Sequence, residues 1–133
     1  MMLDSEIKEL LSQAKIIAVV GCSSNPLRPS FGVSRFLQRL GYRIIPVNPN
    51  ETEVLGERAY ASLRDVPEKI DIVNIFRRPS HVLQVVEDAL TKSVRCIWMQ
   101  EGIVNLEAAQ RAESQGIPVV MDRCILKEIA RLL

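Results

Sequence analysis

Residues 16–30 read Ile-Ile-Ala-Val-Val-Gly-Cys-Ser-Ser-Asn-Pro-Leu-Arg-Pro-Ser, and this stretch decides the predicted fold. Its first five residues are apolar and rich in β-branched side chains, which is typical of a strand buried on both faces. Gly21 ends this run, and a loop of small polar residues follows it. Apolar residues then recur at helical spacing, at positions 33, 36, 37 and 40, before Gly41 ends the pattern. The stretch therefore predicts a strand, a loop and a helix, in that order.

The same alternation continues on both sides of this unit. A helical pattern covers residues 3–14, with Asp4 placed to act as its N-cap. Further strands are predicted at 43–47, 71–75, 95–99 and 119–121, and further helices at 61–66, 79–92, 105–116 and 125–132. Short apolar strands that alternate with helices predict an α/β fold with a Rossmann-like, doubly wound parallel sheet of five strands and helices on both faces. We expect the strand order 3-2-1-4-5, with the switch point between the first and fourth strands.

Length and composition limit the class of protein. A chain of 133 residues suits one domain, 1–133, and 47% hydrophobic with 25% charged residues is typical of a folded soluble protein. The net charge of +1 excludes a strongly basic nucleic-acid-binding protein. No apolar run is long enough to cross a membrane, and the acidic start of the chain is unlike a signal peptide. The three cysteines form no CxxC pair, so we expect a cytoplasmic protein with reduced thiols.

The charge is unevenly distributed along the chain. Residues 10–50 contain no Asp or Glu and carry a charge of +5, so the remaining residues carry −4. The five basic residues are Lys15, Arg28, Arg35, Arg39 and Arg43. A local basic segment in a nearly neutral protein favours a compact anionic ligand, and the alternative is a solvated helix face.

Ligands of such sheets bind outside the carboxyl ends of the strands, here the loops 21–30, 48–51, 76–79, 99–105 and 122–124. The first loop precedes a helix N-terminus, which offers backbone N–H groups and a favourable dipole to a phosphate. Ser23, Ser24 and Asn25 can add hydrogen bonds, and Arg28 can add a charge-assisted one. The alternative is a plain turn in which Ser30 caps the helix.

The loop lacks the dinucleotide fingerprint G-x-G-x-x-G. Only Gly21 matches, because Ser23 and Pro26 occupy the other glycine positions. The acid that usually holds ribose hydroxyls after the second strand is also missing, since the first carboxylate there is Glu51. Such an acid would repel a phosphorylated ribose, so its absence favours NADP or another nucleotide that has one.

Six sequence blocks at the ends of the predicted strands together resemble a known family. They are Gly21-x-Ser23, Pro26-x-Arg28-x-Ser30, Pro46–Pro49, Phe76–Pro79, Trp98–Gln100 and Met121–Cys124. In these blocks the chain resembles the small bacterial and archaeal CoA-binding proteins, which are similar to the N-terminal domain of the succinyl-CoA synthetase alpha subunit. The synthetase carries its phosphorylated histidine in a second domain that these residues do not match, so the resemblance does not imply ligase activity.

The resemblance implies coenzyme A as the ligand and a set of binding residues. The first loop is expected to hold phosphates, the second to border adenine and ribose, the third to form the opposite wall, and the fourth to touch the coenzyme through its backbone. These residues are Gly21, Ser23, Ser24, Asn25, Pro26, Arg28, Ser30, Val47, Asn48, Pro49, Phe76, Arg77, Pro79, Met99, Gln100 and Glu101. The synthetase has a lysine where this chain has Glu51, so we expect Arg28 or Arg77 to contact the ribose phosphate.

Candidates for catalysis are few. His81 is the only histidine and has no evident nucleophile partner. Cys22 and Cys124 either face the cleft, where a thiol can form a mixed disulfide with CoA, or pack as buried apolar residues. We therefore expect a non-catalytic carrier, sensor or partner module for CoA or acyl-CoA, a role compatible with a protein partner or a homodimer. The alternative is a small NADP- or nucleotide-dependent enzyme that uses Cys124, Asp122 or His81.

Overall fold

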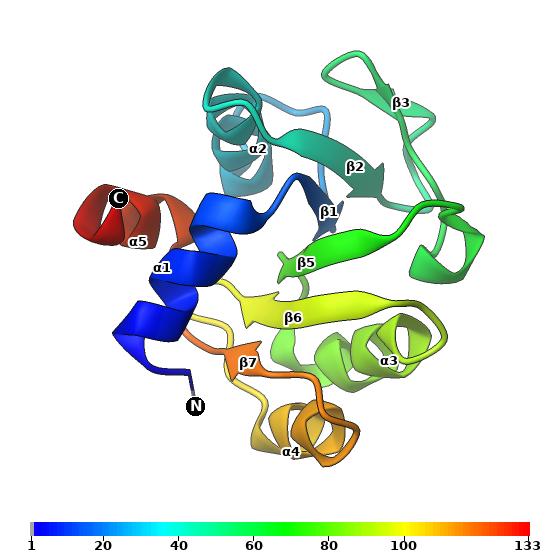
Figure 1. The fold of residues 1–133 in the computed structure, drawn as a ribbon. Coiled ribbons are helices and arrows are strands. Elements are labelled where there is room, and N and C mark those ends of the chain that lie inside the picture. The colour runs from blue at the N-terminus through cyan, green and yellow to red at the C-terminus, as the bar shows by residue number, and fades with distance from the viewer. Residues whose placement is uncertain (1) are drawn as a thin grey trace.

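Five parallel strands form the central sheet of the computed structural model, which describes residues 2–133 (Figure 1). The strands are β1 (Ile16–Val20), β2 (Arg43–Val47), β5 (Ile70–Ile75), β6 (Val94–Met99) and β7 (Val119–Val120). Their order across the sheet is β2-β1-β5-β6-β7. A small antiparallel hairpin, β3 (Glu53–Val54) and β4 (Glu57–Arg58), follows β2.

Helices cover both faces of this sheet (Figure 1). One face carries α3 (Pro79–Ala89), α4 (Leu106–Ser114) and the short 3₁₀ helix η1 (Leu63–Asp65). The other carries α1 (Asp4–Gln13), α2 (Pro29–Arg39) and α5 (Ile125–Leu132). The prediction of a Rossmann-like, doubly wound α/β fold is confirmed. No helix among residues 2–133 has the length and apolar character needed to cross a membrane.

The apolar run at residues 16–20 forms a strand because both of its faces are buried. Ile17 and Val19 pack against α1, α2 and α5, whereas Ala18 and Val20 pack against α3 and η1. All four side chains are at most 7% exposed. Burying a valine or isoleucine side chain stabilises a fold by about 1.5–3 kcal/mol, so this strand is a central element of the core.

The predicted strand order 3-2-1-4-5 is wrong at one position. The third long strand, β5, lies beside β1 on the side away from β2 and is not an edge strand. The connection from β2 to β5 contains the β3–β4 hairpin and a single short helix, η1, which packs beside α3 on the face opposite α2. A right-handed crossover on that face carries the chain back past β1. The switch point therefore lies between β1 and β5.

Three local predictions are also corrected. Leu3, not Asp4, is the N-cap of α1, and its backbone N–H donates to Glu6 Oε1 at 2.8 Å. The helix predicted at 61–66 is only the three-residue η1, and the β3–β4 hairpin was not predicted. The hairpin turn uses Leu55 and Gly56, both at positive φ. Leucine rarely adopts this conformation, so the sequence carries a weak signal for the turn.

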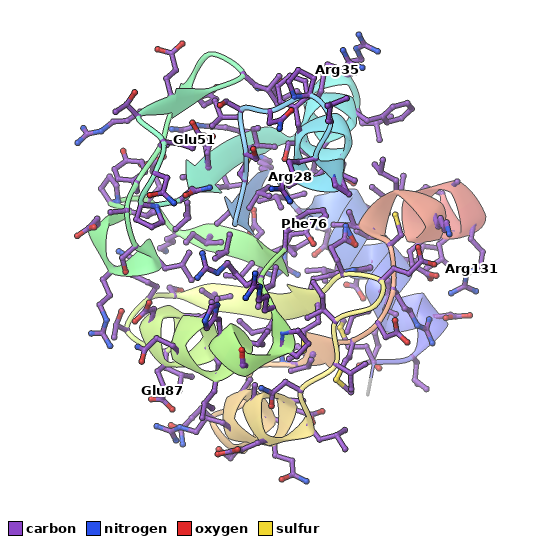
Figure 2. The ribbon with its side chains drawn as sticks, turned by 180° about the vertical axis from the view of Figure 1, so that it is seen from behind. Arg28, Arg35, Glu51, Phe76, Glu87 and Arg131 are labelled. Atoms are coloured by element: carbon purple, nitrogen blue, oxygen red, sulfur yellow. The ribbon has the colours of Figure 1, made fainter. Side chains whose placement is uncertain are left out.

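Arg131 joins the last helix to the first one. Its guanidinium donates to both carboxylate oxygens of Asp4, at 2.8 and 2.9 Å, and to Glu128 (Figure 2). This hydrogen bonding lowers the pKa of Asp4 below its ordinary value of 3.8. A carboxyl group with a lowered pKa in the folded state stabilises the fold above its unfolded pKa, and this contribution is lost as the pH falls through the folded pKa.

We expect Arg131→Gln to lower the melting temperature by roughly 1–3 °C at pH 7, because exposed ion pairs contribute little. The difference from the wild type should begin to shrink as the pH falls below 3.8, the ordinary pKa of the carboxyl group, and it should be lost as the pH falls through the lower pKa of Asp4 in the folded protein. Thermal unfolding followed by circular dichroism at pH 7 and pH 3 measures this. Arg39→Gln is the control, because Arg39 is exposed and makes no ion pair within residues 2–133. An equal difference at both pH values would contradict the role assigned to Asp4.

Candidate functional site

A crevice opens where β1 and β5 end, at the switch point of the sheet. Gly21 N donates to Val47 O, and Phe76 N donates to Val20 O, both at 2.8 Å, so the ladder extends one residue beyond the strands. The chain then turns in opposite directions, because α2 covers one face and α3 the other. Diverging connections leave a crevice at the carboxyl edge of a parallel sheet.

The first part of this crevice is a cavity of about 320 Å³ between the loops that follow β1, β2 and β5, here called the loop cavity. Its lining contains two arginines, two serines and two asparagines but no carboxylate. The lining residues, of which Arg28 and Phe76 are labelled in Figure 2, are Gly21, Ser23, Arg28, Pro29, Ser30, Asn48, Asn50, Phe76 and Arg77. This composition favours an anionic ligand.

Side chains of the first loop hold its own backbone. Ser30 Oγ accepts from Ser23 N at 3.1 Å, Ser23 Oγ accepts from Asn25 N at 3.0 Å, and Asn25 Oδ1 accepts from Leu27 N at 3.0 Å. Both serine hydroxyls act as acceptors here, which leaves their O–H groups free to donate to a ligand. Ser30 does not cap α2, because the N-cap is Arg28, which makes no side-chain cap hydrogen bond. The loop is thus held open with donors at its surface.

Asn48 fixes the second loop against the first. Its Nδ2 donates to Cys22 O at 3.1 Å, and its Oδ1 accepts from Asn50 N at 2.9 Å. Its backbone N–H donates to Tyr60 O at 2.8 Å. One side chain therefore sets the distance between two walls of the loop cavity.

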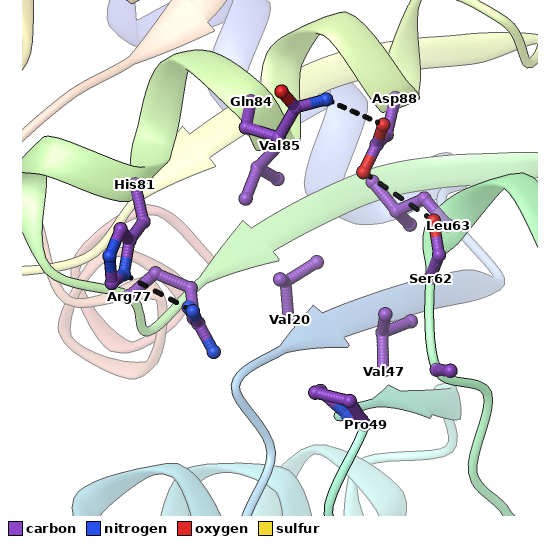
Figure 3. Close-up of a pocket in the computed structure, with 11 residues that line it drawn as sticks. Val20, Val47, Pro49, Ser62, Leu63, Arg77, His81, Gln84, Val85 and Asp88 are labelled. Carbon is purple, nitrogen blue, oxygen red and sulfur yellow. Dashed lines mark hydrogen bonds between the residues drawn. The ribbon is translucent and has the colours of Figure 1, made fainter.

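A second cavity of about 220 Å³ lies beside the first, between β1, β2, η1 and α3, and is here called the helix cavity (Figure 3). Its residues are Val20, Val47, Pro49, Ala61, Ser62, Leu63, Arg77, His81, Gln84, Val85 and Asp88. The walls are mainly apolar. At one end Asp88 forms an ion pair with Arg64 at 2.8 Å, and it also accepts hydrogen bonds from Gln84 Nε2 at 3.1 Å and from Ser62 Oγ at 3.4 Å. The cavity therefore combines mainly apolar walls with a polar end.

Arg77 connects the two cavities, because it lines both. It is partly buried, and its Nη2 lies 3.1 Å from Nδ1 of His81, one helical turn further along (Figure 3). His81 thus positions a guanidinium between the two spaces. An arginine in this position can form two parallel hydrogen bonds with a phosphate group.

The structure brings together about half of the residues proposed from the sequence. Gly21, Ser23, Arg28, Ser30, Asn48, Phe76 and Arg77 line the loop cavity, and Val47, Pro49 and Arg77 line the helix cavity. Ser24, Asn25, Pro26, Pro79, Met99, Gln100 and Glu101 line neither of them.

The residues at the end of β6 and just after it lie apart because of the strand order. With β5 beside β1, the loop after β6 is one strand away from the switch point. Met99 is fully buried under α3 and α4, Gln100 Oε1 accepts from Ile125 N at 2.9 Å, and Glu101 pairs with Lys127 at 3.0 Å. In this structure their side chains support the fold of the carboxyl edge.

Residues of η1 and α3 were missed. Ser62, Leu63, Gln84, Val85 and Asp88 line the helix cavity, and Pro29 and Asn50 line the loop cavity. A signal was available in α3, because Gln84 and Asp88 are four residues apart and share a helix face with His81. This pattern points to the site only when it is known that α3 follows the strand next to β1.

A family model of the CoA binding domain matches residues 15–130, a span that includes all five strands and every residue that lines the two cavities. This chain belongs to the CoA-binding domain family. Its β1 strand begins one residue inside the matched region, and the last helix continues just beyond it. The prediction of this family is confirmed.

Relatives of this CoA-binding domain are of two kinds. The uncharacterized protein YneT of Bacillus subtilis (strain 168) is 47% identical over 121 residues, which cover 91% of this chain and 90% of YneT. A solved structure of a Thermus thermophilus protein has a TM-score of 0.95 and 42% identity, and covers 99% of this chain and 100% of that one. The alpha subunit of acetate–CoA ligase (ADP-forming) II from Pyrococcus furiosus is 32% identical over 80 residues, which cover 59% of this chain. The chain spans only 18% of the length of that ligase subunit.

The cysteines of the CoA-binding domain differ in their surroundings. Cys22 is fully buried, with Sγ 3.5 Å from Ser34 Oγ, and burial raises the pKa of its thiol. Burial also raises the pKa of Cys96 to about 12. Thiols of this kind remain protonated and unreactive at neutral pH. Cys124 is partly exposed as the N-cap of α5, and it lines neither cavity.

The other residues considered for chemistry lie in separate places. His81 faces Arg77 in the helix cavity, whereas Asp122 Oδ1 accepts from Gly102 N at 2.6 Å and joins the loops after β6 and β7. Within residues 2–133 no group of three or more His, Cys, Asp or Glu is arranged to hold a metal ion.

Proposed function

We propose that this domain binds coenzyme A, or an acyl-CoA, across the two connected cavities and acts in the cytoplasm as a non-catalytic carrier, sensor or partner module. One observation carries the proposal: a carboxylate-free cavity with Arg28 and Arg77 opens at the switch point, next to an apolar cavity with a polar end. We treat residues 1–133 as one binding domain. The separate positions of His81, Asp122 and Cys124 support binding without catalysis.

The loop cavity suits the phosphates of the coenzyme. CoA carries a diphosphate and a 3′-phosphate, with a total charge of roughly −3 to −4 near neutral pH. Arg28 and Arg77 offer charge-assisted hydrogen bonds, and the hydroxyls of Ser23 and Ser30 offer neutral ones. We assign the ribose phosphate to one of these two arginines, because Glu51 occupies the position of the family lysine.

The helix cavity suits the adenine ring. Val20, Val47 and Val85 provide apolar surfaces against which a flat purine can pack. Asp88 at the polar end is an acceptor that can receive a hydrogen bond from the exocyclic amino group of adenine. Arg77, between the two cavities, is then placed between the base and the phosphates.

Calorimetry and thermal unfolding with a series of ligands test the proposal. We expect CoA at a hundred times its Kd to raise the melting temperature by about 10 °C. Dephospho-CoA, which lacks the ribose phosphate, and 4′-phosphopantetheine, which lacks the adenosine, should each bind more weakly. NADP should cause no shift. Stabilisation by NADP without stabilisation by CoA would refute the proposal in favour of a nucleotide-dependent enzyme.

A further inference from the structure

Glu51 makes an unusual contact with the first loop. Its Oε2 accepts a hydrogen bond from the backbone N–H of Ser24 at 2.6 Å, although the two residues are 27 positions apart. Ser24 lies in the loop between β1 and α2, and Glu51 lies just after β2 (Figure 2). The neighbouring amides of Ser23, Asn25 and Leu27 are bound by uncharged side chains of the same loop. An ionisable group from another loop therefore holds the amide of Ser24.

A carboxylate in this place resembles the ligand that the loop is proposed to bind. Carboxylates and phosphates are both anions with oxygen acceptors, and both form short, charge-assisted hydrogen bonds with backbone N–H groups. A phosphate that approached Ser24 would find its donor already taken. It would also meet a like charge within a few ångströms, which weakens binding.

The backbone of Glu51 is fixed, but its side chain is attached to the loop by this one contact. Glu51 N donates to Asn48 O at 3.2 Å within the turn that Asn48 organises. The hydrogen bond to Ser24 is at the exposed surface, so the carboxylate can rotate into solvent while both loops stay in place. Its release frees one N–H group and removes one negative charge from the edge of the loop cavity.

We propose that Glu51 is an internal competitor for the phosphate subsite and thereby determines which anions the site accepts. This inference rests on the proposed function. A small free anion makes too few contacts with the site to displace the carboxylate. A nucleotide that also occupies the helix cavity gains additional contacts, so it can bind to Ser24 in place of Glu51. The acid thus selects the complete coenzyme over simple phosphates.

The test compares Glu51→Gln with Glu53→Gln by isothermal titration calorimetry, with CoA and inorganic pyrophosphate as probes. Glutamine keeps a carbonyl acceptor for the Ser24 amide but removes the charge. We expect Glu51→Gln to bind CoA on the order of tenfold more tightly and to bind pyrophosphate measurably where the wild type does not. Glu53→Gln removes the same charge two residues away, from an exposed side chain without a hydrogen bond or ion pair in residues 2–133, and should change CoA affinity by less than about twofold.

The outcomes separate this inference from the proposed function. If the wild type binds CoA and Glu51→Gln binds neither probe more tightly, Glu51 only supports the loop and the inference is wrong while the function stands. If both glutamine variants gain the same affinity for CoA, the effect comes from the overall change in charge and the inference is again wrong. If no protein binds CoA but Glu51→Gln alone gains pyrophosphate binding, the competition is supported and the coenzyme assignment fails.

Discussion

Gly21→Ala is expected to destabilise the protein by about 2–4 kcal/mol and to weaken CoA binding at least tenfold. Gly21 has φ +86°, a conformation that costs an L-residue energy. A Cβ there would lie 2.4 Å from Phe76 O and 3.2 Å from Arg77 Cδ, which no side-chain rotation can relieve because the first contact is with backbone. The ends of β1 and β5 must then separate, and Arg77 moves with them. Urea unfolding and calorimetry measure the two effects.

Gly116→Ala is the matched control for this experiment. Gly116 has a similar φ, +80°, but nothing lies within 4 Å of the position of its Cβ. In the control only the backbone conformation is unfavourable, so the free energy of unfolding should fall by about 1 kcal/mol and CoA binding should be unchanged. Equal destabilisation by the two substitutions would mean that the close approach of Gly21 to the backbone of Phe76 does not exclude a side chain at position 21.

Arg77→Ala is expected to weaken CoA binding by about 1.5–3 kcal/mol, roughly 10- to 150-fold, because a hydrogen bond to a charged group is lost. Arg77 lines both cavities, so its removal affects the contacts of phosphate and of the neighbouring base. Calorimetry at constant salt concentration measures the loss, and the melting temperature of the free protein shows whether the fold is intact.

Arg78→Ala controls for the loss of positive charge. Arg78 is adjacent in sequence and exposed, and it lines neither cavity. We expect its replacement to change CoA affinity by less than about threefold. Similar losses of CoA affinity in the two variants would indicate that these arginines act only by long-range attraction. Arg77 would then not contact the ligand.

The fold class was predictable because β1 and the helix after it carry strong local patterns. The five-residue apolar run requires burial on both faces of a sheet, whatever the strand order. The apolar spacing of α2 predicts a helix that packs on one of these faces, where Leu37 is fully buried although Phe36 and Leu40 stay about half exposed. The order itself was not predictable from these patterns. It depends on residues 48–69, where Leu63 and Val66 insert into the core beside α3 although the only helix in this segment is one turn of 3₁₀ helix. A short apolar pair in a loop does not indicate which face it covers.

The candidate site was predictable to the extent that it is built from loops next to β1. Gly21, Ser23, Arg28 and Asn48 come from the two loops whose positions do not depend on the third strand. Phe76 and Arg77 were proposed through the family resemblance, and both line the loop cavity. Asp88 was missed because its side chain enters the helix cavity only when α3 follows the strand beside β1.

The direct backbone contact between Gly21 and Phe76 also bears on how such a site can change over time. Between the ends of β1 and β5 the spacing of the crevice is set by main-chain atoms, so replacing Arg28 or Phe76 alters the chemistry of the walls without altering the width there. New ligand preferences can therefore arise by single substitutions on an unchanged frame. Gly21 is the exception, because any side chain at this position would push the ends of β1 and β5 apart.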